Sequence, residues 1–120
     1  MITIEIQASC FALTEGLRQH VIRRIEYALR SYRIWVDRVE VQLGDINGPR
    51  GGADKFCRVL VRLPNLPALV IRDLGGDLYA VISSAAERAG RTVGRRIAYR
   101  NRTKRRLGMR FKSRVQFAGT

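Results

Sequence analysis

The chain has 120 residues, enough for one domain with a hydrophobic core, and 46% of them are hydrophobic, which excludes wholesale disorder. No apolar run approaches the length of about 20 residues that a membrane span needs. The 23 lysines and arginines outnumber the ten aspartates and glutamates, so the formal net charge is +13.

The N-terminal segment predicts a strand followed by a helix. Residues 2–7 alternate polar and apolar side chains, as a short strand does and a secretory signal peptide does not, so we expect a cytoplasmic protein. Thr14 is the predicted N-cap of the helix, with Glu15 in its first turn. Apolar residues then recur every three or four positions, which predicts a helix over residues 14–32. These residues are Leu17, Val21, Ile25, Ala28 and Tyr32.

Three further strands are predicted in the middle of the chain. Apolar and polar residues alternate over residues 36–46 and again over 56–63, and an apolar run predicts a strand over 67–73. Residues 47–52 contain three glycines and a proline, which predicts a hairpin loop, and Pro64-Asn65 predicts a tight turn. These strands are therefore joined by short connections.

A long helix is predicted over residues 77–99, after the Gly75-Gly76-Asp77 break. Its apolar stripe recurs with helical spacing, and Gly90 and Gly94 lie beside that stripe, where we expect close packing of the helix against the sheet. Beyond residue 100 the periodicity fails, and residues 101–120 are expected to be a basic, flexible tail. The stripe consists of Leu78, Val81, Ile82, Ala85, Ala89, Val93 and Ile97.

The order of these elements is β-α-β-β-β-α. It predicts an α+β two-layer sandwich, in which a mostly antiparallel four-stranded sheet carries both helices on one face. Residues 1–100 are the predicted domain and residues 101–120 the tail.

The positive charge is concentrated in the last third of the chain. Residues 1–77 carry 11 basic and 9 acidic side chains, whereas residues 78–120 carry 12 basic side chains and one acid, Glu87. The net charges of the two parts are therefore +2 and +11. Twenty of the basic residues are arginines, whose planar guanidinium binds phosphate oxygens in pairs and stacks on bases. A preference for arginine over lysine can reflect genomic base composition, but that does not explain the clustering, which predicts a polyanion ligand.

Arg88, Arg91 and Arg95 are spaced three and four residues apart, so they share one face of the predicted helix. A solvated helix face is the alternative interpretation, but such faces usually mix charges of both signs. The long helix lacks the Asn and Gln side chains that readers of the DNA major groove use, which favours RNA recognised by its shape and phosphates. The other candidate phosphate-binding residues follow along the chain: Arg96, Arg100, Arg102, Lys104, Arg105 and Arg106, then Arg110, Lys112 and Arg114.

Aromatic residues near these arginines are candidates for stacking on bases. Tyr99 lies on the predicted helix, and Phe111 and Phe117 lie in the predicted tail, where they either stack on bases or dock back on the domain. We expect Tyr79 to be a packing residue at the edge of the sheet.

Few residues could support catalysis or metal binding. His20 is expected at the surface or at the boundary of the core, and Cys57 alternates inward with Val59, which predicts a buried thiol. A reducing cytoplasm disfavours a disulfide between Cys10 and Cys57. We find no triad, metal-ligand set or phosphate-binding loop, so we expect no enzyme, no cofactor and no small-molecule substrate.

Two motifs resemble the ribosome hibernation-promoting factors and ribosome-associated inhibitors. Residues 13–21 (LTEGLRQHV) resemble the entry of the first helix of this family, and residues 77–82 (DLYAVI), followed by the basic residues, resemble its second-helix motif. The family also shares the β-α-β-β-β-α order, which is similar to double-stranded-RNA-binding domains. Ser83 stands where the family commonly has an acidic residue. We expect no second domain, so the resemblance is to the short form.

The resemblance implies a non-catalytic factor that binds the small ribosomal subunit through its rRNA and blocks the mRNA and tRNA sites under stress. By position, Arg88, Arg91 and Arg95 match rRNA-contacting residues of the family, and Arg23 and Arg24 match a basic pair in its first helix. We expect a monomer away from the ribosome, as the resemblance to the short form implies a chain without the dimerisation module of the long form. Two alternatives stay open: a general binder of structured RNA, and a regulator that docks on an acidic protein partner.

Overall fold

The computed structural model describes residues 2–9, 11–46 and 55–115, and of residues 104–115 it describes the backbone alone. The elements follow the predicted order, with one short 3-10 helix added after the first helix. They are β1 (Thr3–Ala8), α1 (Glu15–Leu29), η1 (Arg30–Trp35), β2 (Arg38–Asp45), β3 (Lys55–Arg62), β4 (Leu69–Gly75) and α2 (Leu78–Val115). None of the described helices is long and apolar enough to cross a membrane.

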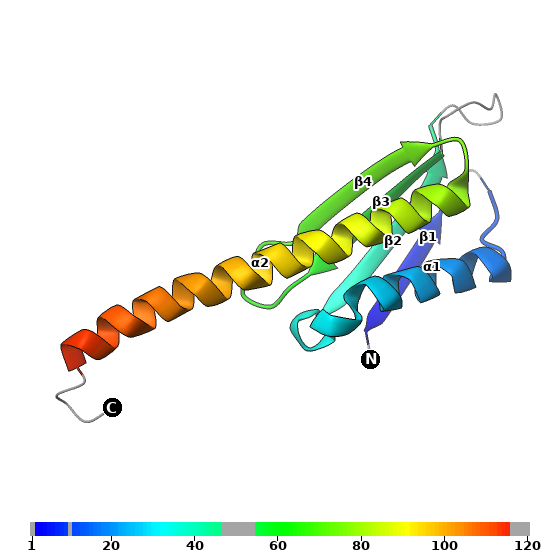
Figure 1. Ribbon diagram of the computed structural model, residues 1–120. Coiled ribbons are helices and arrows are strands. Elements are labelled where there is room, and N and C mark those ends of the chain that lie inside the picture. The colour runs from blue at the N-terminus through cyan, green and yellow to red at the C-terminus, as the bar shows by residue number, and fades with distance from the viewer. Residues whose placement is uncertain (1, 10, 47–54, 116–120) are drawn as a thin grey trace.

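The four strands form one sheet in the order β1-β2-β3-β4. The strand β1 runs parallel to β2, because α1 carries the chain back across the sheet, whereas β2–β3 and β3–β4 are antiparallel pairs. Both helices cover the same face of this sheet (Figure 1). The predicted α+β two-layer fold is therefore confirmed. The predicted loop at residues 47–52 lies outside the described residues.

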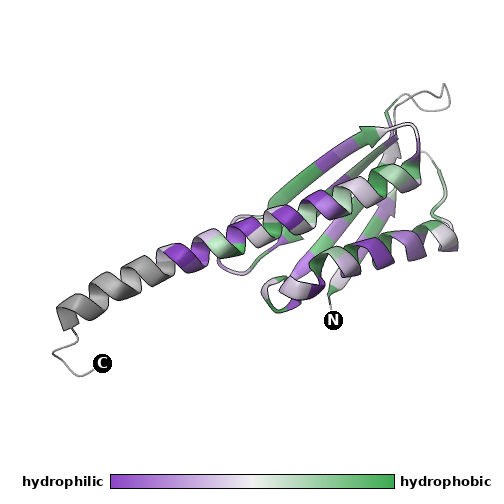
Figure 2. Cartoon of the chain, in the orientation of Figure 1, coloured by the Kyte–Doolittle hydropathy of each residue, from purple (hydrophilic) through white to green (hydrophobic). Residues whose placement is uncertain are grey.

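The core lies between the sheet and the two helices. Alternate residues of the strands point into it, for example Val39 and Val41 of β2 and Val59 and Val61 of β3, and all of these are buried. Helices α1 and α2 contribute their predicted stripes to the same cluster. Hydrophilic residues recur along the outer sides of both helices (Figure 2).

Helix α1 begins as predicted and ends earlier than predicted. The Thr14 hydroxyl accepts a hydrogen bond from the backbone N–H of Leu17 at 3.1 Å, which confirms the N-cap. The helix ends at Leu29, and η1 continues to Trp35. The 3-10 turns of η1 connect the end of α1 to β2, a common use of this helix type.

The two helices run side by side in the same direction and approach closely at the glycines of α2. A Cβ atom at Gly90 would lie 2.6 Å from the carbonyl oxygen of Ala28 in α1, and one at Gly94 would lie 2.5 Å from the hydroxyl of Tyr32 in η1. The glycines therefore permit close packing of helix on helix. The expectation that they pack against the sheet is wrong, because their face of α2 is turned toward α1 and η1.

Helix α2 is much longer than predicted. Its buried stripe ends at Ile97, as expected, but the helix continues to Val115 and extends past the end of the sheet (Figure 1). At 1.5 Å per residue its 38 residues span roughly 57 Å, most of the 69 Å length of the molecule. The predicted end near residue 99 is wrong, because arginine, lysine, leucine and methionine favour a helix even where no apolar stripe marks it. That residues 101–120 are flexible stays a prediction.

Candidate nucleic-acid interface

All twelve basic residues of the last third of the chain lie in α2. One continuous helix therefore carries the net charge of +11, which the sequence pattern assigned to a helix and a separate tail. The structure describes the side chains of α2 as far as residue 103. Within this range the predicted arginines differ in the groups that they contact.

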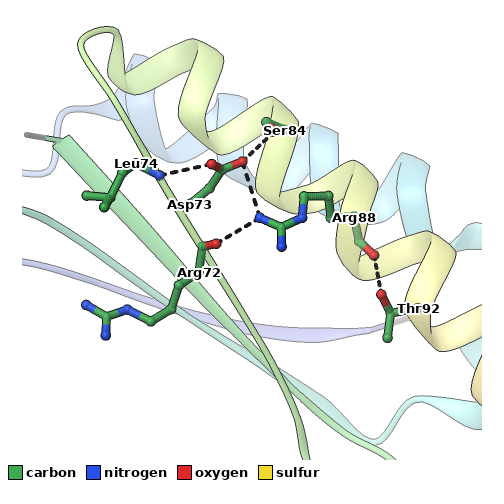
Figure 3. A network of polar contacts seen from close by, with 6 residues as sticks. All are labelled: Arg72, Asp73, Leu74, Ser84, Arg88 and Thr92. Carbon is green, nitrogen blue, oxygen red and sulfur yellow. Dashed lines mark hydrogen bonds and ion pairs between the residues drawn. The ribbon is translucent and has the colours of Figure 1, made fainter. Parts of the chain in front are cut away.

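Arg88 is held against β4 by a network of polar contacts (Figure 3). Its Nη1 donates to the backbone oxygen of Arg72 at 2.9 Å and lies 3.8 Å from the carboxylate of Asp73. Asp73 in turn accepts hydrogen bonds from the Ser84 hydroxyl and from the backbone N–H of Leu74. This network ties α2 to the edge of the sheet, so part of the positive charge of Arg88 is neutralised within the protein.

Arg91 and Arg95 point away from the core and differ in their partners. Arg91 donates to the Glu87 carboxylate at 2.7 Å, one helical turn away. Arg95 donates to the hydroxyl of Thr92 at 3.2 Å, and no described acidic group forms an ion pair with it. Arg102 is exposed and lies on the same side of α2, since it follows Arg95 by seven residues. We call Arg91, Arg95 and Arg102 the outer basic face.

Arg96 and Arg100 lie on another side of α2, against the turn between β3 and β4. Arg96 donates to the backbone oxygen of Pro67 at 2.9 Å, and Arg100 donates to that of Pro64 at 3.5 Å. Both side chains are half-buried. One such bond uses only one of the several N–H donors of a guanidinium, so both arginines keep donors for another ligand. Lys104, Arg105 and Arg106 lie further along α2, on residues described by their backbone alone.

Helix α1 contributes Arg24 to a groove between the two helices. This groove has a volume of about 410 Å³ and brings Arg24 together with Arg91 of α2. Arg30 also lines it, and its guanidinium lies 4.6 Å from the centre of the Tyr27 ring. The sequence did not single out Arg30, because it belongs to η1 and its position there depends on where α1 ends. Arg23 is exposed on α1 and does not line this groove.

Tyr79 faces α1 instead of the sheet edge where it was expected. Its ring meets that of His20 edge-on, with 4.7 Å between their centres, and the Nε2 atom of His20 lies 3.2 Å from the Ser83 hydroxyl. His20 therefore connects the N-terminal ends of the two helices. Phe111 lies in α2, and Phe117 lies outside the described residues.

The thiol of Cys57 is buried in the core, as predicted, and it is not bonded to another cysteine. Burial and the nearby negative charge of Asp73 raise the pKa of this thiol from 9.0 to about 12. Cys57 is thus protonated at neutral pH and is a poor nucleophile. Cys10 lies outside the described residues, and no three described histidine, cysteine or acidic side chains are grouped as metal ligands.

Residues 4–101 match the protein family described as sigma 54 modulation protein/S30EA ribosomal protein. Comparison with curated proteins finds no match.

Two solved structures share the fold. A ribosomal subunit interface protein from Coxiella burnetii superposes with a TM-score of 0.70 at 11% identity, over 81% of this chain and 99% of the other. The N-terminal domain of Protein Y from Thermus thermophilus superposes with a TM-score of 0.62 at 22% identity, over 78% of this chain and 96% of the other. At these identities the likeness concerns the fold.

Proposed function

The chain belongs to the sigma 54 modulation protein/S30EA ribosomal protein family, as its two motifs predicted, and from this premise we propose that it is a ribosome-associated inhibitor of translation. It binds the small ribosomal subunit in the cytoplasm through rRNA, occupies the mRNA and tRNA sites and so silences ribosomes under stress. It catalyses no reaction, and its effect comes from occupying these sites.

The observation that carries this proposal is the concentration of charge on α2. A helix with twelve basic residues and one acid repels itself in water, because like charges one turn apart destabilise it by a few tenths of a kcal/mol per pair. A polyanion removes that repulsion and releases its own condensed counterions, which gives strong binding with little dependence on sequence. rRNA supplies phosphates at high density on a folded surface.

The shape of α2 favours a ligand that is itself large. The part of the helix that extends past the sheet, residues 98–115, is roughly 27 Å long and reaches phosphates well beyond the body of the protein. Asn101 is the single amide side chain in α2, and it is half-buried. A helix of this kind contacts phosphates over a long path and reads few base edges, as expected for recognition by shape.

Co-sedimentation with small ribosomal subunits tests the proposal. The protein should pellet with the subunits at low salt and be released as salt rises. If about eight phosphates are contacted, the slope of log affinity against log salt should be about −6 to −7. Absence from the subunit fraction even at low salt would contradict the proposal.

A matched pair of variants locates the interface. Arg95→Glu with Arg102→Glu reverses two charges of the outer basic face and should abolish pelleting. Arg58→Glu with Arg72→Glu makes the same change in net charge on paired residues of β3 and β4, on the face of the sheet away from the helices, and should leave pelleting close to wild type. Equal loss in both variants would mean that net charge alone drives the binding.

The same assay separates the two alternatives. A general binder of structured RNA would bind free duplex RNA as tightly as it binds subunits. A regulator that docks on an acidic protein would stay bound to its partner after treatment with ribonuclease. The inhibitor that we propose prefers subunits to free duplex RNA and is released by ribonuclease.

A further inference from the structure

A second groove lies where α2 leaves the sheet, and it shares Arg95 with the outer basic face. It has a volume of about 670 Å³, within the range of small-ligand sites. One wall is the turn between β3 and β4, and the other is α2, and no acidic side chain is among the described residues that line it. Its lining residues are Leu66, Pro67, Thr92, Arg95, Arg96, Tyr99, Arg100 and Thr103.

The wall formed by the turn is rigid. Leu66 donates its backbone N–H to the oxygen of Leu63 at 3.2 Å, and between them Pro64 fixes its own backbone while Asn65 adopts the left-handed conformation with a φ of 63°. The turn directs the carbonyl oxygens of Pro64 and Pro67 at Arg100 and Arg96. The two guanidinium groups are thereby held beside the groove before any ligand arrives, which lowers the entropy lost on binding.

Tyr99 has no packing role that explains its position. It is 66% exposed and follows the last core residue of α2, Ile97, by two positions. It lies one turn from Arg95 and is the aromatic residue of the groove, whose other apolar lining comes from Leu66 and Pro67. A flat ring surrounded by arginines in an apolar hollow is the arrangement in which proteins hold an unpaired base and its phosphates.

We propose that this groove binds one unstacked nucleotide of an RNA strand. The base stacks on Tyr99 and covers Leu66 and Pro67, while the neighbouring phosphates accept hydrogen bonds from Arg95, Arg96 and Arg100. The inference rests on the proposed function for the class of ligand, RNA. It adds a contact to a base, which the charge of α2 does not provide.

An acidic peptide is an alternative ligand for the arginines of this groove, because it is also negatively charged. Carboxylates would pair with the arginines, but they would leave the tyrosine ring and the apolar wall uncovered. A base covers both, because every base has an apolar π-face of similar size to the ring.

Two probes that differ only in their bases test the proposal. Fluorescence anisotropy at low salt compares a short oligoadenylate with an abasic oligomer of the same length and charge. We expect the wild-type protein to bind the oligoadenylate about tenfold more tightly. This is the gain in affinity expected from one base stacked on an aromatic side chain. Tyr99→Ala should lose this preference and keep its affinity for the abasic oligomer, while Tyr99→Phe should keep both.

Tyr79→Ala is the matched control. Tyr79 lies on the same helix, 45% exposed and roughly 30 Å away, so its removal should leave the preference unchanged. The proposal is overturned if Tyr99→Ala keeps the preference, if the wild-type protein shows none, or if polyglutamate binds more tightly than oligoadenylate in a manner that depends on Tyr99.

Co-sedimentation of the same samples keeps the two proposals apart. A wild-type protein that pellets with subunits but has no preference for bases overturns the groove and supports the proposed function. A wild-type protein that prefers bases through Tyr99 but never pellets supports the groove and overturns the ribosomal target.

Discussion

From Leu78 to Ile97, α2 lies against the sheet and α1 and buries seven apolar residues, whereas from residue 98 onward it extends past the sheet, and none of the side chains of residues 98–103 is buried. Tertiary packing therefore holds the inner half of the helix. The outer half depends on helix propensity and carries basic residues that repel each other. The inner half thus combines the packing that stabilises the fold with Arg91 and Arg95 of the outer basic face, whereas the outer half can be changed without disturbing the described core.

Removal of residues 101–120 should have the largest effect and should act on affinity alone. The deletion removes seven basic side chains of the outer half. Affinity for small subunits at low salt should fall about a hundredfold or more, and the salt slope should become shallower by up to about 5. Urea unfolding of the remaining chain should be unchanged, because the described core ends at Ile97.

A full-length control keeps the helix and removes the charge. Replacement of the same seven basic residues by glutamine should weaken binding as much as the deletion does. A loss of all detectable binding after deletion alone would mean that the outer half is the whole interface and that the inner arginines contribute nothing.

The same substitution at two glycines should have opposite effects on the two halves. Gly90→Ala places a Cβ atom against the backbone oxygen of Ala28, so it should destabilise the fold by about 1–3 kcal/mol despite its better helix propensity. Gly108→Ala lies in the outer half, where it should stabilise the helix by up to about 1 kcal/mol. Urea unfolding measures the first effect and helix content by circular dichroism the second.

A stabilising Gly90→Ala would contradict the close approach of the two helices. A Gly108→Ala variant that lowers helix content would contradict the extension of α2 beyond residue 100.

Arg88 and Arg95 test whether stability and affinity depend on different residues within the inner half. Arg88→Ala removes the bond to the Arg72 carbonyl and the ion pair with Asp73, and it should lower the free energy of unfolding by about 1 kcal/mol. Arg95→Ala removes a contact to a hydroxyl on the same helix and should leave stability within about 0.5 kcal/mol of wild type while lowering affinity for subunits. Thermal unfolding and co-sedimentation of both variants give the comparison. If Arg88→Ala lowered the affinity and Arg95→Ala lowered the stability instead, Arg88 would be the contact with RNA.

The inner half of α2 could be predicted because a buried helix face requires a regular spacing of apolar residues in the sequence. Apolar residues from Leu78 to Ile97 must recur with helical spacing to face the core, and that spacing is visible without a structure. None of the described side chains of the outer half, residues 98–103, is buried, so no apolar spacing marks this part, and the predicted helix ended where the stripe ended. The first three strands were predicted for the same reason, since their alternation follows from one buried face, whereas β4 was predicted from an apolar run.

Contacts between distant segments could not be predicted. That Gly90 meets Ala28 depends on the packing of α1 against α2, and that Asp73 pairs with Arg88 depends on the position of β4 beside α2. The sequence placed Arg88, Arg91 and Arg95 on one side of a helix. Arg91 pairs with Glu87 one turn away on the same helix, whereas the acid that pairs with Arg88 lies 15 residues away along the chain.

The position of α2 at the end of the element order also affects how the protein is synthesised. Its seven buried residues complete a core whose other parts, α1 and the four strands, are made earlier. Until Ile97 has left the exit tunnel, the apolar face of the sheet lacks half of its helical cover, and domains of this size fold as units. The basic helix and the finished body therefore appear together, once α2 has been made. A chain interrupted earlier exposes apolar surface, cannot engage RNA through α2, and is a substrate for chaperones and proteases.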